Sequence, residues 1–216
     1  MVLYLHGARW NLTGHLNRIA RLREFGFSVF AIDYRGFGKS DGDLPSEASV
    51  YEDARVGWNW VVAREPDPAR RFIYGHSLGG AVAVDLAAGL ANGGGGGAAR
   101  GLIVESSFTN FADMASEITR GLFPSAMLSQ KFDSIGKIAQ VRMPVLVVHG
   151  EGDRYVPVRF SEALYAAAPA PKRLLVVPNG SHNNSLSIGG SDYRRVLVEF
   201  FGLGAEGRVA GVGTGS

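Results

Sequence analysis

The residues Gly75-His76-Ser77-Leu78-Gly79 have the G-x-S-x-G spacing that presents a nucleophilic serine at a tight turn. The apolar run from Arg71 to Tyr74 predicts a buried strand before the motif, and the alanine-rich stretch 81–88 predicts a helix after it. Between these elements the serine must adopt strained backbone angles, and side chains at the two glycine positions would collide with neighbouring backbone. The free N–H groups of the new helix favour negative charge at the same place. We therefore expect Ser77 to be a catalytic nucleophile and not part of a plain glycine-rich turn.

A serine hydroxyl needs a base to remove its proton, and histidine has the near-neutral pKa for that task. Sites in open parallel α/β sheets form at the carboxyl ends of strands, so the partners of Ser77 should lie in loops that follow strands. His182, in the loop 178–187, is the best candidate base among the five histidines, with a solvent-facing loop histidine as the alternative. Asp153, after another strand, would orient the imidazole ring. Glu151 and Asp133 are the rival carboxylates.

An oxyanion that forms on the substrate would need backbone N–H donors beside the serine. The residue after the nucleophile, Leu78, should supply one donor. The loop after the first predicted strand should supply the other from Ala8, with Arg9 as the alternative, since the preceding Gly7 lets this loop approach the serine closely. Asp33 also ends a strand, but it precedes the nucleophile, and we interpret it as a carboxylate that holds a loop in place.

The composition argues against several other classes of protein. The chain has no cysteine and no pair of histidines at the spacing of a zinc site, so we expect neither a metal nor another cofactor. The glycine run 93–97 ends a helix and lacks a following lysine, which disfavours a phosphate cradle. A net charge of +2 without a basic run gives no indication of nucleic-acid binding, although the sequence pI is about 9.0.

The hydropathy of the chain also bears on its location. No apolar run approaches the roughly 20 residues of a membrane span, and the first residues lack the layout of a signal peptide. We expect a cytoplasmic protein whose partner is a small ester or acyl substrate. The oligomeric state is left open.

The elements that must position these residues alternate along the chain. Continuous apolar runs predict six strands, at residues 2–5, 27–32, 71–74, 101–105, 144–148 and 173–177. Helical spacing or composition predicts helices between and after them, over 16–25, 46–63, 81 to about 92, 159–168 and 192–201. This order predicts one α/β domain over residues 1–203, with a largely parallel six-stranded sheet and helices on both faces. The glycine-rich tail 204–216 is predicted to be disordered.

The segment from about 107 to 141 is too long for an ordinary connection between two elements. We interpret it as a small helical lid, with a plain surface helix as the alternative. Its phenylalanine and methionine side chains would form an apolar acyl pocket, although they could equally belong to the core.

Together the motifs resemble the α/β-hydrolase superfamily, in particular its serine-aminopeptidase-like branch with monoacylglycerol-lipase-like and bud-emergence-type hydrolases. The resemblance runs from Leu3 to about Phe201 and rests on five segments, 5–7, 33–40, 75–80, 149–153 and 180–182. It implies a Ser77-Asp153-His182 triad, which follows the chain order of that superfamily, and oxyanion donors at Ala8 and Leu78. It says little about the substrate, because this branch includes esterases, lipases, thioesterases and peptidases.

The sequence departs from the family pattern in two places. The antiparallel hairpin that normally precedes the first strand is missing, so we expect an N-terminally incomplete chain with an exposed edge strand. Asn184, two residues after the predicted base, stands where many relatives have an acid.

The sequence thus predicts a serine hydrolase that cleaves carboxylic ester-type substrates through an acyl-enzyme. A thioesterase or a serine aminopeptidase with the same triad is the alternative. The aminopeptidase would need a carboxylate to hold the substrate amine, for which Glu105, Asp113 and Glu117 are candidates. A non-catalytic binding protein on the same fold is the third possibility.

Overall fold

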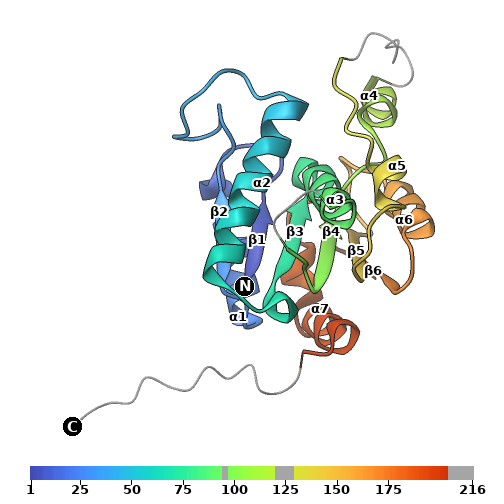
Figure 1. Ribbon diagram of the computed structural model, residues 1–216. Coiled ribbons are helices and arrows are strands. Elements are labelled where there is room, and N and C mark those ends of the chain that lie inside the picture. The colour runs from blue at the N-terminus through green and yellow to red at the C-terminus, as the bar shows by residue number, and fades with distance from the viewer. Residues whose placement is uncertain (94–96, 120–128, 204–216) are drawn as a thin grey trace.

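A six-stranded, all-parallel β-sheet forms the centre of the protein in a computed structural model that describes residues 1–93, 97–119 and 129–203 (Figure 1). The strands lie in the order β2-β1-β3-β4-β5-β6. Their bounds are β1 Val2–Leu5, β2 Val29–Ile32, β3 Phe72–His76, β4 Gly101–Glu105, β5 Val145–Gly150 and β6 Lys172–Val177. The sequence prediction of a parallel α/β sheet is confirmed.

Helices cover both faces of this sheet, as Figure 1 shows. The helices are α1 Leu16–Glu24, α2 Glu47–Arg64, α3 Leu78–Ala91, α4 Phe111–Thr119, α5 Ser134–Ile138, α6 Val158–Ala167 and α7 Ser185–Phe201, with short 3₁₀ turns at Leu12–His15 and Pro68–Arg70. One core cluster joins one face of the sheet to α2, α3, α5 and α6, and a second joins the opposite face to α1 and α7. In β1, Leu3 and Leu5 belong to the first cluster, and Val2 and Tyr4 belong to the second. Since both faces are buried, the strands are continuous apolar runs without polar alternation.

The register of the strands places their carboxyl ends together at one end of the sheet. Leu5 pairs with Gly75, His76 pairs with Glu105, and Glu105 pairs with Val148. The loops after β1, β3, β5 and β6 therefore begin side by side, although they are far apart in the sequence. β2 forms an edge of the sheet, as expected, and residues 1–93, 97–119 and 129–203 contain no antiparallel strand beside it.

The helix predicted from residue 81 begins at Leu78, and two further predicted boundaries are wrong for identifiable reasons. Phe27 was expected in the second strand, but its N–H donates to Leu22 O at 3.1 Å, so it closes the end of α1 after Gly26 with its φ of +98°. The last helix was expected from residue 192, but it begins at Ser185 and is kinked at Gly190, whose φ is +40°. The polar and glycine-rich start of α7 hides its helical spacing, and buried Leu186 anchors it.

The region interpreted as a lid is only partly described, because residues 120–128 lie outside the described ranges. Helix α4 lies at the upper end of the molecule in Figure 1 and buries none of its residues fully. The chain that follows is attached to α2, since the Glu47 carboxylate accepts hydrogen bonds from the amides of Lys131 and Phe132 at 2.7 and 2.9 Å. The lid remains a prediction. The predicted tail, 204–216, also lies outside the described residues.

None of the helices in the described part of the chain is long and apolar enough to cross a membrane.

Candidate active site

The turn between β3 and α3 holds Ser77 in a backbone conformation that non-glycine residues rarely adopt, with φ +56° and ψ −121°. A Cβ atom at Gly75 would lie 2.1 Å from Gly79 O, and a Cβ atom at Gly79 would lie 2.0 Å from Leu5 O. Both distances are far below van der Waals contact, so only glycine fits at these positions. The predicted steric reason for the two glycines is confirmed.

The backbone of Ser77 is held from both sides. Its N–H donates to Glu105 O at 2.9 Å, and its carbonyl accepts a hydrogen bond from Ser107 Oγ at 2.9 Å. The Ser77 side chain makes no hydrogen bond that caps α3, although the residue occupies the N-cap position. The turn therefore fixes the backbone and leaves the hydroxyl available for chemistry.

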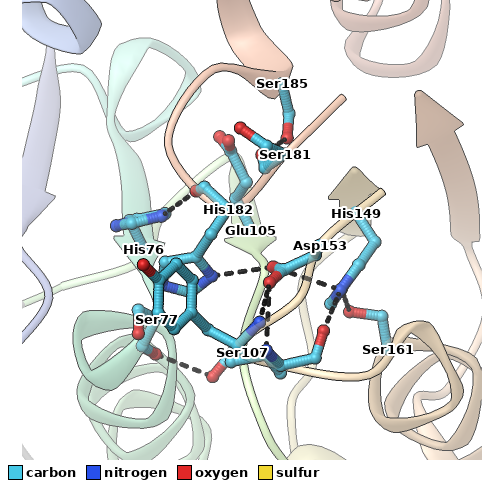
Figure 2. A network of polar contacts seen from close by, with 12 residues as sticks. His76, Ser77, Glu105, Ser107, His149, Asp153, Ser161, Ser181, His182 and Ser185 are labelled. Carbon is cyan, nitrogen blue, oxygen red and sulfur yellow. Dashed lines mark hydrogen bonds and ion pairs between the residues drawn. The ribbon is translucent and has the colours of Figure 1, made fainter. Parts of the chain in front are cut away.

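Asp153 and His182 meet across the loops that follow β5 and β6, with 2.7 Å between His182 Nδ1 and Asp153 Oδ2 (Figure 2). The other carboxylate oxygen, Asp153 Oδ1, accepts the backbone N–H groups of Tyr155 and Val156 at 2.9 and 3.0 Å. Burial alone would raise the pKa of Asp153, but the hydrogen bond and charge of His182, together with the two amides, lower it below its ordinary value. The carboxylate is thus ionised, and it orients the imidazole so that Nδ1 carries a proton.

The two loops are joined directly beside this pair. Gly152 N donates to Gly180 O at 2.7 Å, and a Cβ atom at Gly150 would lie 2.6 Å from Gly180 O. Asn184 closes the turn that carries His182, because its Oδ1 accepts the Ser181 N–H at 2.6 Å. This is a structural use for the asparagine that departs from the family pattern.

The rival carboxylates lie elsewhere. Asp133 caps α5 by accepting the Gly136 N–H at 3.0 Å. Glu151 is exposed, and its Oε2 lies 3.4 Å from the Asn179 N–H. Of the three carboxylates considered from the sequence, the structure joins only Asp153 to His182.

The loop after β1 approaches the elbow closely. A Cβ atom at Gly7 would lie 3.1 Å from Ser77 Cβ, so the loop that leads to Ala8 passes close to the nucleophile. The Leu78 N–H is in the first turn of α3, where a helix supplies no acceptor. Asp33 accepts the Leu12 N–H at 2.8 Å, which confirms its predicted role in holding this loop.

Among the described residues, the Ser77 hydroxyl and His182 make no hydrogen bond to each other. Such bonds are often long in enzymes without substrate and shorten only when the substrate binds. The arrangement has a positioned histidine, an ionised orienting carboxylate and a serine on a strained turn, which are the groups required for acyl transfer.

Glu105 is the clearest error of the sequence interpretation, which considered it as a ligand for a substrate amine. It ends β4, is fully buried, and pairs with Arg18 of α1 at 3.0 Å. Its second oxygen accepts the hydroxyl groups of Tyr74 and Tyr193. The signal for this structural role was present, since Glu105 closes a continuous apolar strand.

The other two candidates for an amine ligand are also engaged. Asp113 accepts hydrogen bonds from Thr109 Oγ1 and Asn110 Nδ2 at 2.6 and 2.7 Å. Glu117 pairs with Arg159.

A second histidine, His149, lies beside Asp153, and the sequence pattern does not indicate this contact. Buried His149 places Nε2 2.8 Å from Val156 O and 3.4 Å from Asp153 Oδ2, and its Nδ1 lies 2.7 Å from Ser161 Oγ. Burial lowers the pKa of His149, so the ring is neutral and donates from Nε2. Its position at the end of a strand indicated a place near the site, but not this contact.

No metal site is found in the described ranges, and a cavity elsewhere in the fold does not include these residues. Within the described ranges there is no group of three or more histidine, cysteine, aspartate or glutamate side chains that could hold a metal ion. A cavity of about 750 Å³ opens between α2, α3 and α5, beside the Asp85–Lys137 ion pair, and Ser77 and His182 do not line it.

Comparison with known proteins gives the following similarities. The profile of the family described as "Serine aminopeptidase, S33" matches residues 1–135, and that of "PhoPQ-activated pathogenicity-related protein" matches residues 117–209. "Uncharacterized protein YfhR" of Escherichia coli (strain K12) is 35% identical over 202 residues, which cover 92% of this chain and 69% of that protein. "Lysophosphatidylserine lipase ABHD12" of Danio rerio is 34% identical over 194 residues, 81% of this chain and 48% of that protein. The Pyrococcus furiosus esterase Pf2001 shares the fold at a TM-score of 0.72 and 18% identity, over 94% of this chain and 80% of the esterase.

Proposed function

The chain belongs to the serine aminopeptidase S33 family of α/β-hydrolases, and on that premise we propose that it is a serine hydrolase that cleaves carboxylic esters. The observation that carries the proposal is the 2.7 Å hydrogen bond between Asp153 and His182 at the edge of the sheet where Ser77 lies on its strained turn. In this proposal Ser77 is the nucleophile, His182 the base and Asp153 the residue that orients the base.

The first half of the reaction forms an acyl-enzyme. His182 Nε2 takes the hydroxyl proton while Ser77 Oγ attacks the ester carbonyl carbon, and the carbonyl π electrons move to oxygen. The N–H groups of Ala8 and Leu78 stabilise that oxyanion. When the C–O bond to the alcohol breaks, His182 gives its proton to the leaving alkoxide. Asp153 remains ionised and stabilises the transient imidazolium.

The second half repeats these steps with water. His182 removes a proton from a water molecule that attacks the acyl carbon, and the second tetrahedral intermediate uses the same two N–H donors. Collapse breaks the bond to Ser77 Oγ, which regains a proton from His182, and the carboxylic acid leaves. Every proton in the cycle passes through one side chain, so no cofactor has a part in it.

Esters are favoured over peptides by the state of the carboxylates that could hold a substrate amine. An aminopeptidase needs an available carboxylate for the substrate amine, and the three candidates are buried or already hydrogen-bonded. A lipase and an esterase among the similar proteins also support an ester substrate. A thioester would be attacked by the same groups, and comparison of matched oxygen and sulfur esters distinguishes the two.

A fluorophosphonate probe tests the proposal without knowledge of the natural substrate. We expect the protein to be labelled at Ser77 and the Ser77→Ala variant to be unlabelled, because the probe needs an activated serine. Ser187→Ala is a matched control that should be labelled like the parent, since it removes an exposed hydroxyl of α7. A folded protein that takes no label, or that loses none in Ser77→Ala, would refute the proposed function.

A further inference from the structure

The backbone carbonyl of His182 accepts two side-chain hydrogen bonds from elsewhere in the fold. His76 Nε2 lies 2.8 Å from His182 O, and Arg18 Nη2 lies 3.4 Å from the same atom. His76 is the residue before the nucleophile, so the first of these bonds ties the elbow to the loop of the base (Figure 2). The two imidazole rings also pack together, with centroids 4.8 Å apart.

The direction of the shorter bond is determined by chemistry. A carbonyl oxygen can only accept, so His76 must carry its proton on Nε2. Burial, together with the positive charge of Arg18, holds the pKa of His76 well below its ordinary value, and the ring is therefore neutral. Its Nδ1 atom is buried and has no partner among the described residues.

The longer bond belongs to a buried network that also reaches the nucleophile. Arg18 donates to the Glu105 carboxylate at 3.0 Å, while the Glu105 carbonyl accepts the Ser77 N–H at 2.9 Å. Arg18 and Glu105 are 5% and 0% exposed, so both groups depend on their protein partners for solvation. Glu105 thus bonds to the nucleophile through its backbone carbonyl and to Arg18 through its side chain, and Arg18 in turn bonds to the backbone of the base.

We propose that His76 is a positioning residue, which acts through the His182 carbonyl to hold the base in line with Ser77, and that Arg18 assists it at the same atom. The proposal rests on the function proposed above. Proton transfer needs donor and acceptor within hydrogen-bond reach, and a displacement of about 1 Å can cost roughly 100-fold in rate. The loop after β6 contains Gly180 and would otherwise be free to move. Hydrogen bonds to the His182 carbonyl restrict that displacement.

The test compares two variants that differ in a single donor. His76→Gln can place an amide N–H near the position of Nε2, whereas His76→Met has the same length and no donor. Tyr193→Phe is the matched control, since it removes a hydroxyl from the Glu105 side of the network without touching His182. The readouts are the thermal midpoint and fluorophosphonate labelling, with the maximal labelling rate and the half-saturating probe concentration determined separately.

We expect His76→Met to lower the maximal labelling rate about 10- to 100-fold with little change in half-saturation, while His76→Gln and Tyr193→Phe stay within about 3-fold of the parent. Equal rates for His76→Met and His76→Gln would overturn the positioning role, as would a loss that appears only in half-saturation. If His76→Met does not fold, the test rests on folded His76→Gln. A labelling rate near that of the parent would support the proposal, and a rate reduced 10-fold or more would overturn it. A parent protein that takes no label refutes the proposed function itself, whereas labelling that is insensitive to His76 refutes only this inference.

Discussion

Replacement of Asp153 by asparagine tests the assignment of roles in the site most directly. An asparagine can face its carbonyl oxygen either toward His182 or toward the amides of Tyr155 and Val156, which now bond to Asp153 Oδ1 at 2.9 and 3.0 Å. Turning the NH₂ group toward those amides would leave two N–H donors facing a donor, at about 0.5–1.5 kcal/mol for each lost bond. Turning the NH₂ group toward His182 instead would disturb only one hydrogen bond, that between His182 Nδ1 and Oδ2 of residue 153. The NH₂ group should therefore face His182.

In that orientation Nδ1 of His182 becomes an acceptor and the proton moves to Nε2. The ring then cannot take a proton from Ser77, because Nε2 is already occupied. Loss of the correct tautomer costs about 10⁴-fold in turnover in serine hydrolases, which corresponds to about 5.4 kcal/mol in activation free energy.

The assay is the rate of fluorophosphonate labelling, followed by hydrolysis of p-nitrophenyl esters once a substrate is found. Glu151→Gln is the control, since this carboxylate is two residues away and exposed, and it should change the rate less than 2-fold. The fold should persist in both variants, as judged by circular dichroism. An Asp153→Asn variant within 10-fold of the parent, or a larger loss in Glu151→Gln, would refute the assigned roles.

Three further predictions concern stability. Gly79→Ala should lower the free energy of unfolding by more than about 3 kcal/mol, because its Cβ would overlap backbone. Gly89→Ala, in the same helix, has no atom within 4 Å of its Cβ and should stabilise the protein by up to about 1 kcal/mol. Equal urea midpoints for the two variants would contradict this prediction. The pKa of Asp153 in the folded protein lies below its unfolded value of 3.8, so ionised Asp153 should stabilise the fold fully above pH 3.8 and lose this contribution as the pH falls through the folded pKa. The free energy of unfolding of Asp153→Asn should therefore fall less steeply with acid than that of the parent. Arg18→Met should cost about 3–5 kcal/mol by leaving Glu105 buried and unpaired, and urea unfolding of Arg18→Met with Glu105→Gln should show part of that loss restored.

Part of this structure follows from patterns that extend over a few residues. The elbow is visible in the sequence because its determinants are local, with two glycines that avoid backbone overlap beside a strand and a helix. The parallel sheet is visible for a similar reason, since strands buried on both faces must be continuous apolar runs. Element order then places the candidate residues at the carboxyl ends of the strands, so the sequence predicts Asp153 and His182 as partners, and the structure places them 2.7 Å apart.

The errors have a common cause, which is that side-chain environment depends on elements distant in sequence. Glu105 is a candidate substrate ligand in the sequence because its charge is evident, but its partner Arg18 is 87 residues away in α1. The kinked start of α7 was missed because polar residues and glycines have weak helical preference, and only packing against the sheet makes them helical.

The sequence by itself therefore predicted the nucleophile turn, the class of fold and the candidate base, because each depends on local sterics, on hydrophobic periodicity or on the order of the elements, and it left Asp153 with two rival carboxylates. The tertiary structure alone decided which carboxylate reaches His182, which histidine is neutral and donates to a carbonyl, and which charges are buried as a pair. These depend on distances across the sheet, where a difference of about 1 Å separates a hydrogen bond from no contact. No one-dimensional pattern encodes a distance of that precision.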